Sequence, residues 1–332
     1  MARPLRIEFP GAVYHVMARG NQGQKICADD ADREMWLATL VQAWHRTGWR
    51  LHAWALMGNH YHLLLETPEP NLVSGMKWLQ GTYTQRYNAR HRQRGHLFQG
   101  RYRAVPVDAE SGLNFQAVST YIHLNPARAR QIRIGEQKLW QYPWSSYPSY
   151  VRQPPPPWLN TERVLGSLGL PPQARRAYAA YMESRVLELG IKAGRKELES
   201  GWKSLRRGWY VGSEGFRKAL LSRIEEPPSD GRHPSAPRTG PHDQSRAEEM
   251  LDSGLNLLGL QAEDLPRLPK GQKEKMVLAW WLYGRTTVNR RWLAQRLTMG
   301  YETRISQAMH WVERSREPSI AKMKKKLAKH GL

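Results

Sequence analysis

Residues 50–66, RLHAWALMGNHYHLLLE, read as two strand-like runs separated by the pair Gly58 and Asn59. This pair suits a tight hairpin, so the sequence predicts two neighbouring antiparallel strands. Side chains alternate across a strand, which places His60 and His62 on one face and Tyr61 on the other. Two imidazoles side by side can share one divalent metal ion. The same pair also suits the solvated face of a half-exposed sheet. Two ligands are too few to hold a metal ion, so a metal site needs a third ligand nearby.

The segments around this hairpin alternate between strand and helix patterns. Strand-like or extended stretches cover residues 10–21 and 95–108, and helical patterns cover 29–48, 71–91 and 113–129, the last stopping near Pro126. The order β-α-β-β-α-β-α predicts an α+β fold, a ferredoxin-like antiparallel sheet with helices on one face.

Composition divides the chain into four predicted parts. Residues 1–150 hold the sheet domain, and 151–224 form a helical extension with basic patches. Residues 225–246 are rich in Pro, Gly and Ser and poor in large apolar side chains, which predicts a flexible linker. Residues 247–332 form a C-terminal domain.

The charge of the chain points to a polyanionic partner. There are 51 Lys and Arg against 29 Asp and Glu, a formal net charge of +22. Nucleic acid is the commonest polyanion in a cell, although a merely basic soluble protein fits the same balance. The single cysteine, Cys27, excludes an intramolecular disulfide framework and a Cys-based zinc site. No apolar signal core or membrane span is evident, so we expect a cytoplasmic protein without a membrane partner.

A third ligand for the histidine pair is available in residues 119–129, STYIHLNPARA. Tyr121 and Asn125 are four residues apart and project from the same face of a helix, whereas His123 lies well round from them. If that face meets the histidines, the Asn125 amide oxygen completes a metal site, and Tyr121 becomes a nucleophile toward a phosphodiester. A core tyrosine followed by a helix-ending Asn-Pro has the same spacing, so the spacing leaves both readings open.

The segments MGNHYHLLLE, RGHLFQGRYRAVPVD and YIHLNPARA, in this order, resemble the single-tyrosine HUH transposases. The chain is most similar to the REP-associated tyrosine transposases, over roughly residues 5–150. The resemblance implies that His60, His62 and Asn125 bind Mg²⁺ or Mn²⁺ and that Tyr121 is the nucleophile. Gly58 stands where members commonly have Pro, and it still permits the turn.

The resemblance also implies an activity. Members recognise hairpin-forming repeats in single-stranded DNA, cut one strand through a 5′-phosphotyrosine bond and rejoin the ends by reversing the step. A regulator that binds DNA on the same fold without cutting it is the main alternative, and a basic RNA-binding factor is another. Whether the protein is a monomer or a homodimer stays open. The candidate DNA contacts in this domain are basic residues: Lys77, Arg86, Arg90, Arg94, Arg101 and Arg103.

Residues 286–315 have the spacing of a helix-turn-helix, with a helix from Arg290 to Leu297, a turn at 298–300 and a second helix from Glu302. They resemble the helix-turn-helix modules at the end of longer members of the transposase family, which implies binding to duplex DNA. A plain helical hairpin that packs without binding is the alternative. The candidate contacts lie on the second helix: Tyr301, Thr303, Arg304 and Gln307.

Overall fold

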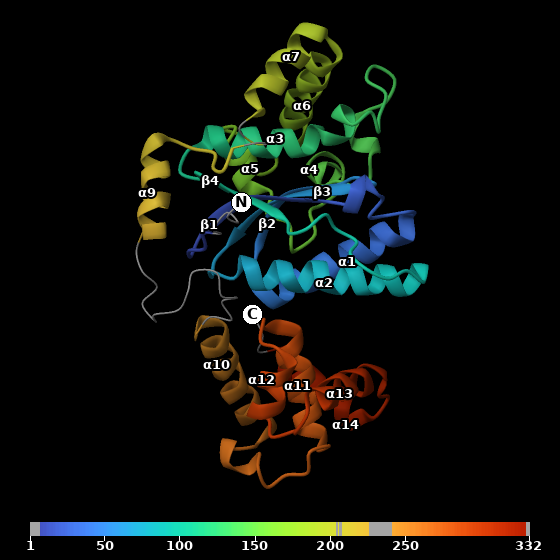
Figure 1. Ribbon diagram of the computed structural model, residues 1–332, viewed down its shortest axis with the longest axis vertical. Helices are drawn as coiled ribbons and strands as arrows, with labels where there is room; N and C mark the ends of the chain where they lie inside the picture. The colour runs from blue at the N-terminus through green and yellow to red at the C-terminus, as the bar shows by residue number, and fades with distance from the viewer. Residues whose placement is uncertain (1–6, 204, 206–207, 226–240, 330–332) are drawn as a thin grey trace. The chain divides into compact units, whose positions relative to one another are not determined.

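The computed structural model describes residues 7–203, 205, 208–225 and 241–329. They form two compact units, a sheet-containing unit in the N-terminal part of the chain and a helical unit in the C-terminal part (Figure 1). Most of the predicted linker, residues 226–240, lies outside the described residues, and residues 241–246 already belong to helix α10 (Pro241–Leu258). Among the described helices, none is both long enough and apolar enough to cross a membrane.

The sheet unit is built on four antiparallel strands in the order β2-β3-β1-β4. The strands are β1 (Ala12–Arg19), β2 (Arg50–Leu56), β3 (His60–Thr67) and β4 (Arg103–Val107). Strands β2 and β3 form the predicted hairpin, and the strand order confirms the ferredoxin-like sheet. In the register of β1 and β3, Met17 pairs with His62 and Arg19 with His60, so these side chains share one face.

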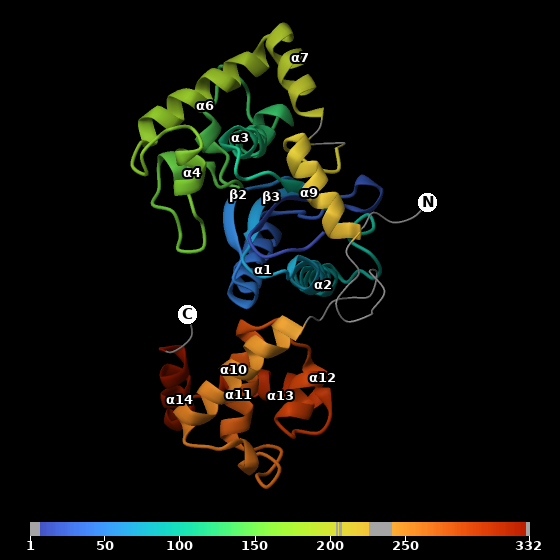
Figure 2. The ribbon, with the colours of Figure 1, turned by 90° about the vertical axis from the view of Figure 1, so that its left-hand side faces the viewer.

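Helices cover both faces of the sheet, and the prediction of helices on one face was wrong (Figure 2). Helices α1 (Asp30–Thr47) and α2 (Leu72–His91) lie on the Tyr61 face, where the Trp36 ring is 5.1 Å from that of Tyr61. Helix α3 (Gly112–Arg128) covers the His62 face. The sequence of β3 indicates that both faces are covered, because its consecutive leucines Leu63, Leu64 and Leu65 are all buried. A strand with one solvated face would alternate apolar and polar residues.

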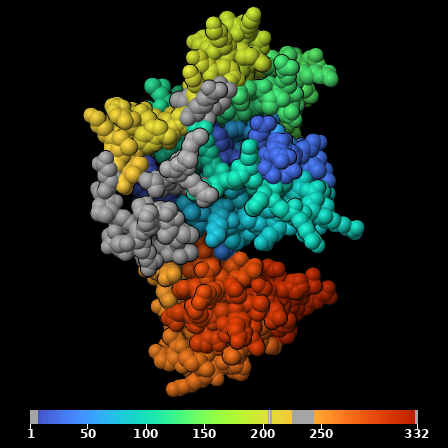
Figure 3. Space-filling model, in the orientation of Figure 1, coloured from blue at the N-terminus to red at the C-terminus, as the bar shows by residue number. Residues whose placement is uncertain are grey.

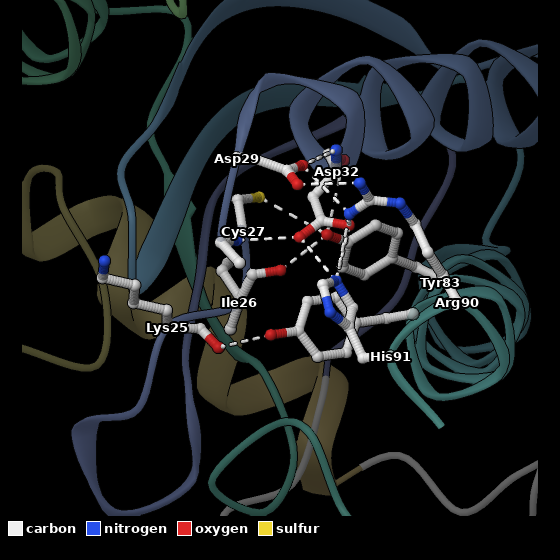
Figure 4. Close-up of polar contacts among 10 residues, drawn as sticks. Lys25, Ile26, Cys27, Asp29, Asp32, Tyr83, Arg90 and His91 are labelled. Carbon is white, nitrogen blue, oxygen red and sulfur yellow. Dashed lines mark hydrogen bonds and ion pairs between the residues drawn. The ribbon is translucent and has the colours of Figure 1, made fainter. Parts of the chain in front are cut away.

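A buried carboxylate ties helix α2 to the loop that leads into α1 (Figure 4). Asp32 has no exposed surface, and its carboxylate accepts hydrogen bonds from Arg90 (2.6 Å), from the ring of His91 (2.9 Å) and from the backbone N–H of Ala28 (2.8 Å). Because every oxygen of this carboxylate has a donor, its burial is compensated. The network therefore fixes the end of α2 against the loop beside the β2–β3 hairpin.

Helix α3 passes through the proline near which the sequence predicts its end. It stops at Arg128, two residues after Pro126. Pro126 lacks an N–H, but the carbonyl of Asn125 accepts from Ala129 at 2.8 Å and the Asn125 side chain bonds back to the carbonyl of Tyr121 at 3.0 Å. The extra half-turn brings Arg128 onto the face of the helix that carries Tyr121.

The chain after residue 128 packs onto α3 within the same unit. His123 of α3 is fully buried, with Nδ1 2.7 Å from the hydroxyl of Tyr178 and Nε2 2.7 Å from the hydroxyl of Ser146. Residue Val211 forms a bridge with Val107 at the β4 edge. The helices of this region are α4 (Tyr147–Val151), α5 (Glu162–Gly166), α6 (Arg175–Gly190), α7 (Lys192–Gly201) and α9 (Glu214–Glu225).

The helical unit has its own apolar core, which includes Leu251, Leu282 and Ile305. Lys275 is buried in this unit, and its ammonium group donates to the backbone oxygen of Leu265 and to the hydroxyl of Thr298. Two of its helices lie close to the positions that the sequence predicts for a helix-turn-helix. Besides α10 the helices are α11 (Lys273–Arg285), α12 (Arg290–Arg296), α13 (Glu302–Arg314) and α14 (Pro318–Ala328).

Candidate active site

Two histidines of strand β3 form the centre of the candidate site. The rings of His60 and His62 have centroids 5.2 Å apart and planes at 90°. Nδ1 of His60 lies 2.7 Å from Oδ1 of Asn59, and Nδ1 of His62 lies 2.9 Å from Nε2 of His15. Each ring is therefore held through Nδ1, and Nε2 is the nitrogen that remains for a ligand.

Both imidazoles are neutral at physiological pH. Burial lowers the pKa of His60 to about 4, and the charges of Arg19 and Arg128 add to the shift. Burial, together with the neighbouring imidazoles and Arg128, holds the pKa of His62 well below its usual value. A neutral imidazole keeps the lone pair that binding to a metal requires.

Helix α3 brings Tyr121 to the histidines. The Tyr121 ring meets His62 edge-on at a centroid distance of 5.4 Å, and it meets His15 in the same way at 5.6 Å. Asn125 lies one turn along on the same helix and is fully buried. Of the four residues that the sequence singled out, His62 has ring contacts with both His60 and Tyr121, and Asn125 lies one helical turn from Tyr121.

Arg128 joins the parts of the site, and the sequence analysis missed it. Its Nη1 donates to Oδ1 of Asn125 at 3.1 Å and to the hydroxyl of Tyr121 at 3.4 Å. Its Nε also forms a 2.7 Å ion pair with Glu199 of α7. Arg128 lies three residues after Asn125 and seven after Tyr121, a spacing that places all three on one face of a helix. Because the helix was expected to end near Pro126, this spacing was not applied to Arg128.

A tryptophan from the chain after α7 covers the tyrosine. The ring of Trp202 lies 5.3 Å from that of Tyr121, and only 2% of Tyr121 is exposed. Glu199, three residues earlier in α7, forms the ion pair with Arg128. Little of the phenol is therefore open to solvent in this conformation.

The donor set fits a divalent cation with mixed nitrogen and oxygen ligands. His60 and His62 offer neutral nitrogens, and Asn125 offers an amide oxygen that Arg128 holds in this structure. Within the described part of the chain, no cluster of three or more His, Cys, Asp or Glu side chains could hold a metal ion. An amide as the third ligand is compatible with that finding. Imidazoles suit transition metals and amide oxygens suit Mg²⁺ and Mn²⁺, so the set alone leaves the ion open.

The basic residues proposed for DNA contact fall into two groups. Lys77, Arg94 and Arg101 are exposed, and the end of α2 with the segment after it, turquoise in Figure 3, lies at the surface. The others are engaged within the protein: Arg86 donates to Thr39 and Gln42, Arg90 binds Asp29 and Asp32, and Arg103 donates to the backbone oxygen of Gly208. DNA contact by either group stays a prediction.

Arg90 and Arg94 offer a direct comparison. We expect Arg94→Ala to weaken DNA binding and to reduce the slope of log affinity against log salt by about 1. We expect Arg90→Ala to lower the thermal unfolding temperature, because it removes the main cation from buried Asp32, and to leave the salt slope nearly unchanged. Fluorescence anisotropy over a salt series and thermal unfolding measure the two effects. The assignment fails if Arg90→Ala reduces the slope as much as Arg94→Ala does.

The predicted contacts of the C-terminal unit are all available at its surface. Tyr301 is 81% exposed, and Thr303, Arg304 and Gln307 are exposed in the first turns of α13. The opposite face of α13 is buried through Ile305, Ala308 and Val312, which gives the helix a clear inner and outer side. The outer side is the one that carries the candidate contacts.

A comparison with protein families finds a match in the sheet unit. Residues 9–125 match the family described as "Transposase IS200 like". Among solved structures, one described as "Structure of the REP associates tyrosine transposase bound to a REP hairpin" is 14% identical, with a TM-score of 0.38; the match covers 44% of this chain and 82% of that chain. A search of curated proteins found no match.

The family match begins before β1 and extends to Asn125, so it contains the whole sheet and each of the four site residues on β3 and α3. The match supports the resemblance to a transposase family over residues 9–125. Through this domain, the chain is similar to the IS200-like transposases.

Proposed function

We propose that the protein is a metal-dependent DNA strand transferase that recognises hairpin-forming repeats in single-stranded DNA and cuts and rejoins them through a 5′-phosphotyrosine intermediate. The observation that carries this proposal is the edge-on contact of Tyr121 with His62, whose ring in turn contacts that of His60. The family match, which contains all four residues, and the net charge of +22 support it.

His60, His62 and Asn125 would hold Mg²⁺ or Mn²⁺, which supplies Lewis-acid polarisation of the scissile phosphate when bound. The Tyr121 oxygen attacks the phosphorus, loses its proton and forms a bond to the 5′-phosphate. The bond from phosphorus to the 3′ oxygen breaks, and that oxygen leaves as a 3′-hydroxyl after taking up a proton. Rejoining reverses these steps, since a 3′-hydroxyl attacks the phosphotyrosine and releases the phenol.

Arg128 has two roles in the proposed reaction. It places a positive charge 3.4 Å from the phenol oxygen, next to the place where negative charge develops during attack. It also donates to Oδ1 of Asn125, so it and a cation compete for the same oxygen. We infer that Arg128 turns away from Asn125 when the cation binds and remains near the phosphate.

The burial of Tyr121 beneath Trp202 favours a second candidate function, a regulator that binds DNA without cutting it. A labelled single-stranded oligonucleotide with a hairpin separates the two. With Mg²⁺ or Mn²⁺ present, the transferase releases a fragment whose 3′-hydroxyl a polymerase extends. Binding without any cleavage in either metal identifies the regulator, and equal affinity for an RNA hairpin of the same sequence contradicts a specific role on DNA.

The C-terminal unit is proposed to bind duplex DNA through the outer side of α13. We expect Arg304→Ala to weaken binding to a hairpin with a duplex extension and to reduce the salt slope by about 1. Arg267→Ala is the matched control, because it removes an equal charge from an exposed position outside α13. Anisotropy titrations at several salt concentrations measure both variants. Equal losses in the two would mean that only the total charge matters, and the assignment to α13 would then be wrong.

A further inference from the structure

A third histidine, His15, lies behind the two proposed ligands. It stands in strand β1 with no exposed surface, and its Nε2 is 2.9 Å from Nδ1 of His62. The two rings are stacked at a centroid distance of 5.1 Å, and the edge of Tyr121 meets His15 at 5.6 Å. His15 therefore contacts both the proposed ligand and the proposed nucleophile.

A hydrogen bond between two neutral imidazoles needs one N–H and one lone pair. If His62 donates from Nδ1, its Nε2 carries a lone pair and can bind a metal. If His15 donates from Nε2, then His62 accepts at Nδ1. In that case Nε2 of His62 carries the proton of the His62 ring and cannot bind a metal. The proton between the two rings thus decides whether His62 is a ligand.

A comparison within the same unit shows how this pair differs from a structural histidine. His123 is equally buried, but its two nitrogens meet the hydroxyls of Tyr178 and Ser146. A hydroxyl rotates to donate or accept, so either tautomer of His123 is satisfied. His15 has an imidazole as its partner, and the tautomers of the two rings are coupled. Leu64 pairs with His15 across the strands, so an apolar side chain would suit this position for packing.

We propose that His15 is a positioning residue whose Nε2 accepts the Nδ1 proton of His62 and so fixes the tautomer that presents Nε2 of His62 to a divalent cation. This rests on the proposed function, in which His62 is a ligand. The arrangement is the usual one for a ligating histidine, whose second nitrogen is held by a neighbouring acceptor. Here the acceptor is a buried imidazole on the adjacent strand.

Two measurements on the full chain without DNA test the proposal. Nitrogen-15 NMR of histidine-labelled, metal-free protein should show His62 protonated at Nδ1 and His15 lacking a proton at Nε2. Titration calorimetry with Mn²⁺ should show His15→Leu binding about 10–100-fold more weakly. His15→Gln places an amide oxygen where Nε2 lies and should bind nearly as tightly as the wild type. His52→Leu, which removes another buried histidine of the sheet, should leave Mn²⁺ affinity unchanged.

The outcomes separate this inference from the proposed function. If His62→Ala loses Mn²⁺ binding while folded His15→Leu keeps it, His15 does not position the ligand, and the metal site stands. If His62→Ala binds Mn²⁺ as the wild type does, the metal site itself is wrong. Should His15→Leu fail to fold, the tautomer in the wild-type spectrum still decides, because a proton on Nε2 of His62 overturns the proposal. Loss of affinity in His15→Gln equal to that in His15→Leu also contradicts it.

Discussion

Tyr121→Phe is expected to abolish strand cleavage and the covalent protein–DNA adduct while DNA affinity stays close to that of the wild type. The substitution removes one oxygen, which is the attacking atom in the proposed reaction. The ring keeps its contacts with His62 and Trp202, so packing should survive. Denaturing gels of the reaction with hairpin DNA measure the adduct, and anisotropy measures the affinity.

Tyr61→Phe is the matched control for this change. Tyr61 is the neighbour of both histidines in sequence, but it faces α1 and α2, and its hydroxyl accepts from Gln80 at 3.0 Å. We expect this variant to cut DNA as the wild type does. An adduct that persists in Tyr121→Phe and maps to another tyrosine, such as Tyr61 or Tyr102, would contradict the assignment.

His60→Ala and His62→Ala are each expected to reduce cleavage by about two orders of magnitude or more, and EDTA should do the same to the wild type. Either change removes charge stabilisation of several kcal/mol from the transition state. Rates of cleavage at saturating protein measure the loss. Adding Mg²⁺ or Mn²⁺ after EDTA should restore the wild type and leave the variants inactive. Undiminished cleavage in EDTA would refute the metal site.

Asn125→Ala should have a milder effect on the same assay. Water can replace one neutral oxygen ligand, so a metal held by His60 and His62 can remain. The side chain also donates to the carbonyl of Tyr121, one turn earlier on α3, and this bond is lost in the variant. A smaller loss of rate, partly recovered at high metal concentration, is the expected result.

The sequence predicted those features of the fold that local chemistry determines. Asp29 accepts from the N–H of Asp32 at the start of α1, and Gly48 ends that helix with a φ of 67°, so the helix matches the helical pattern predicted over residues 29–48. The hairpin at Gly58 and Asn59 follows from the same kind of signal. The consecutive leucines 63–65 indicate that both faces of the sheet are covered, but local patterns could not tell which helix covers which face, because that depends on where α3 returns.

The predicted part of the candidate site is likewise the part with regular spacing. His60 and His62 follow from alternation along a strand, and Tyr121 and Asn125 follow from helical period. His15 and Trp202 enter from positions far away in the sequence, and no periodicity connects them to the site. His15 shares a face with Met17, but only the register of β1 on β3 reveals that this face meets His62.

The most direct test of the central claim is to locate the covalent bond. The full chain is incubated with Mg²⁺ or Mn²⁺ and a single-stranded oligonucleotide that contains a hairpin, the SDS-resistant product is digested with nuclease and protease, and the peptides are analysed by mass spectrometry. The proposed mechanism predicts a nucleotide joined through its 5′-phosphate to Tyr121. A linkage at another residue, or no linkage under conditions in which the strand is cut, would contradict it.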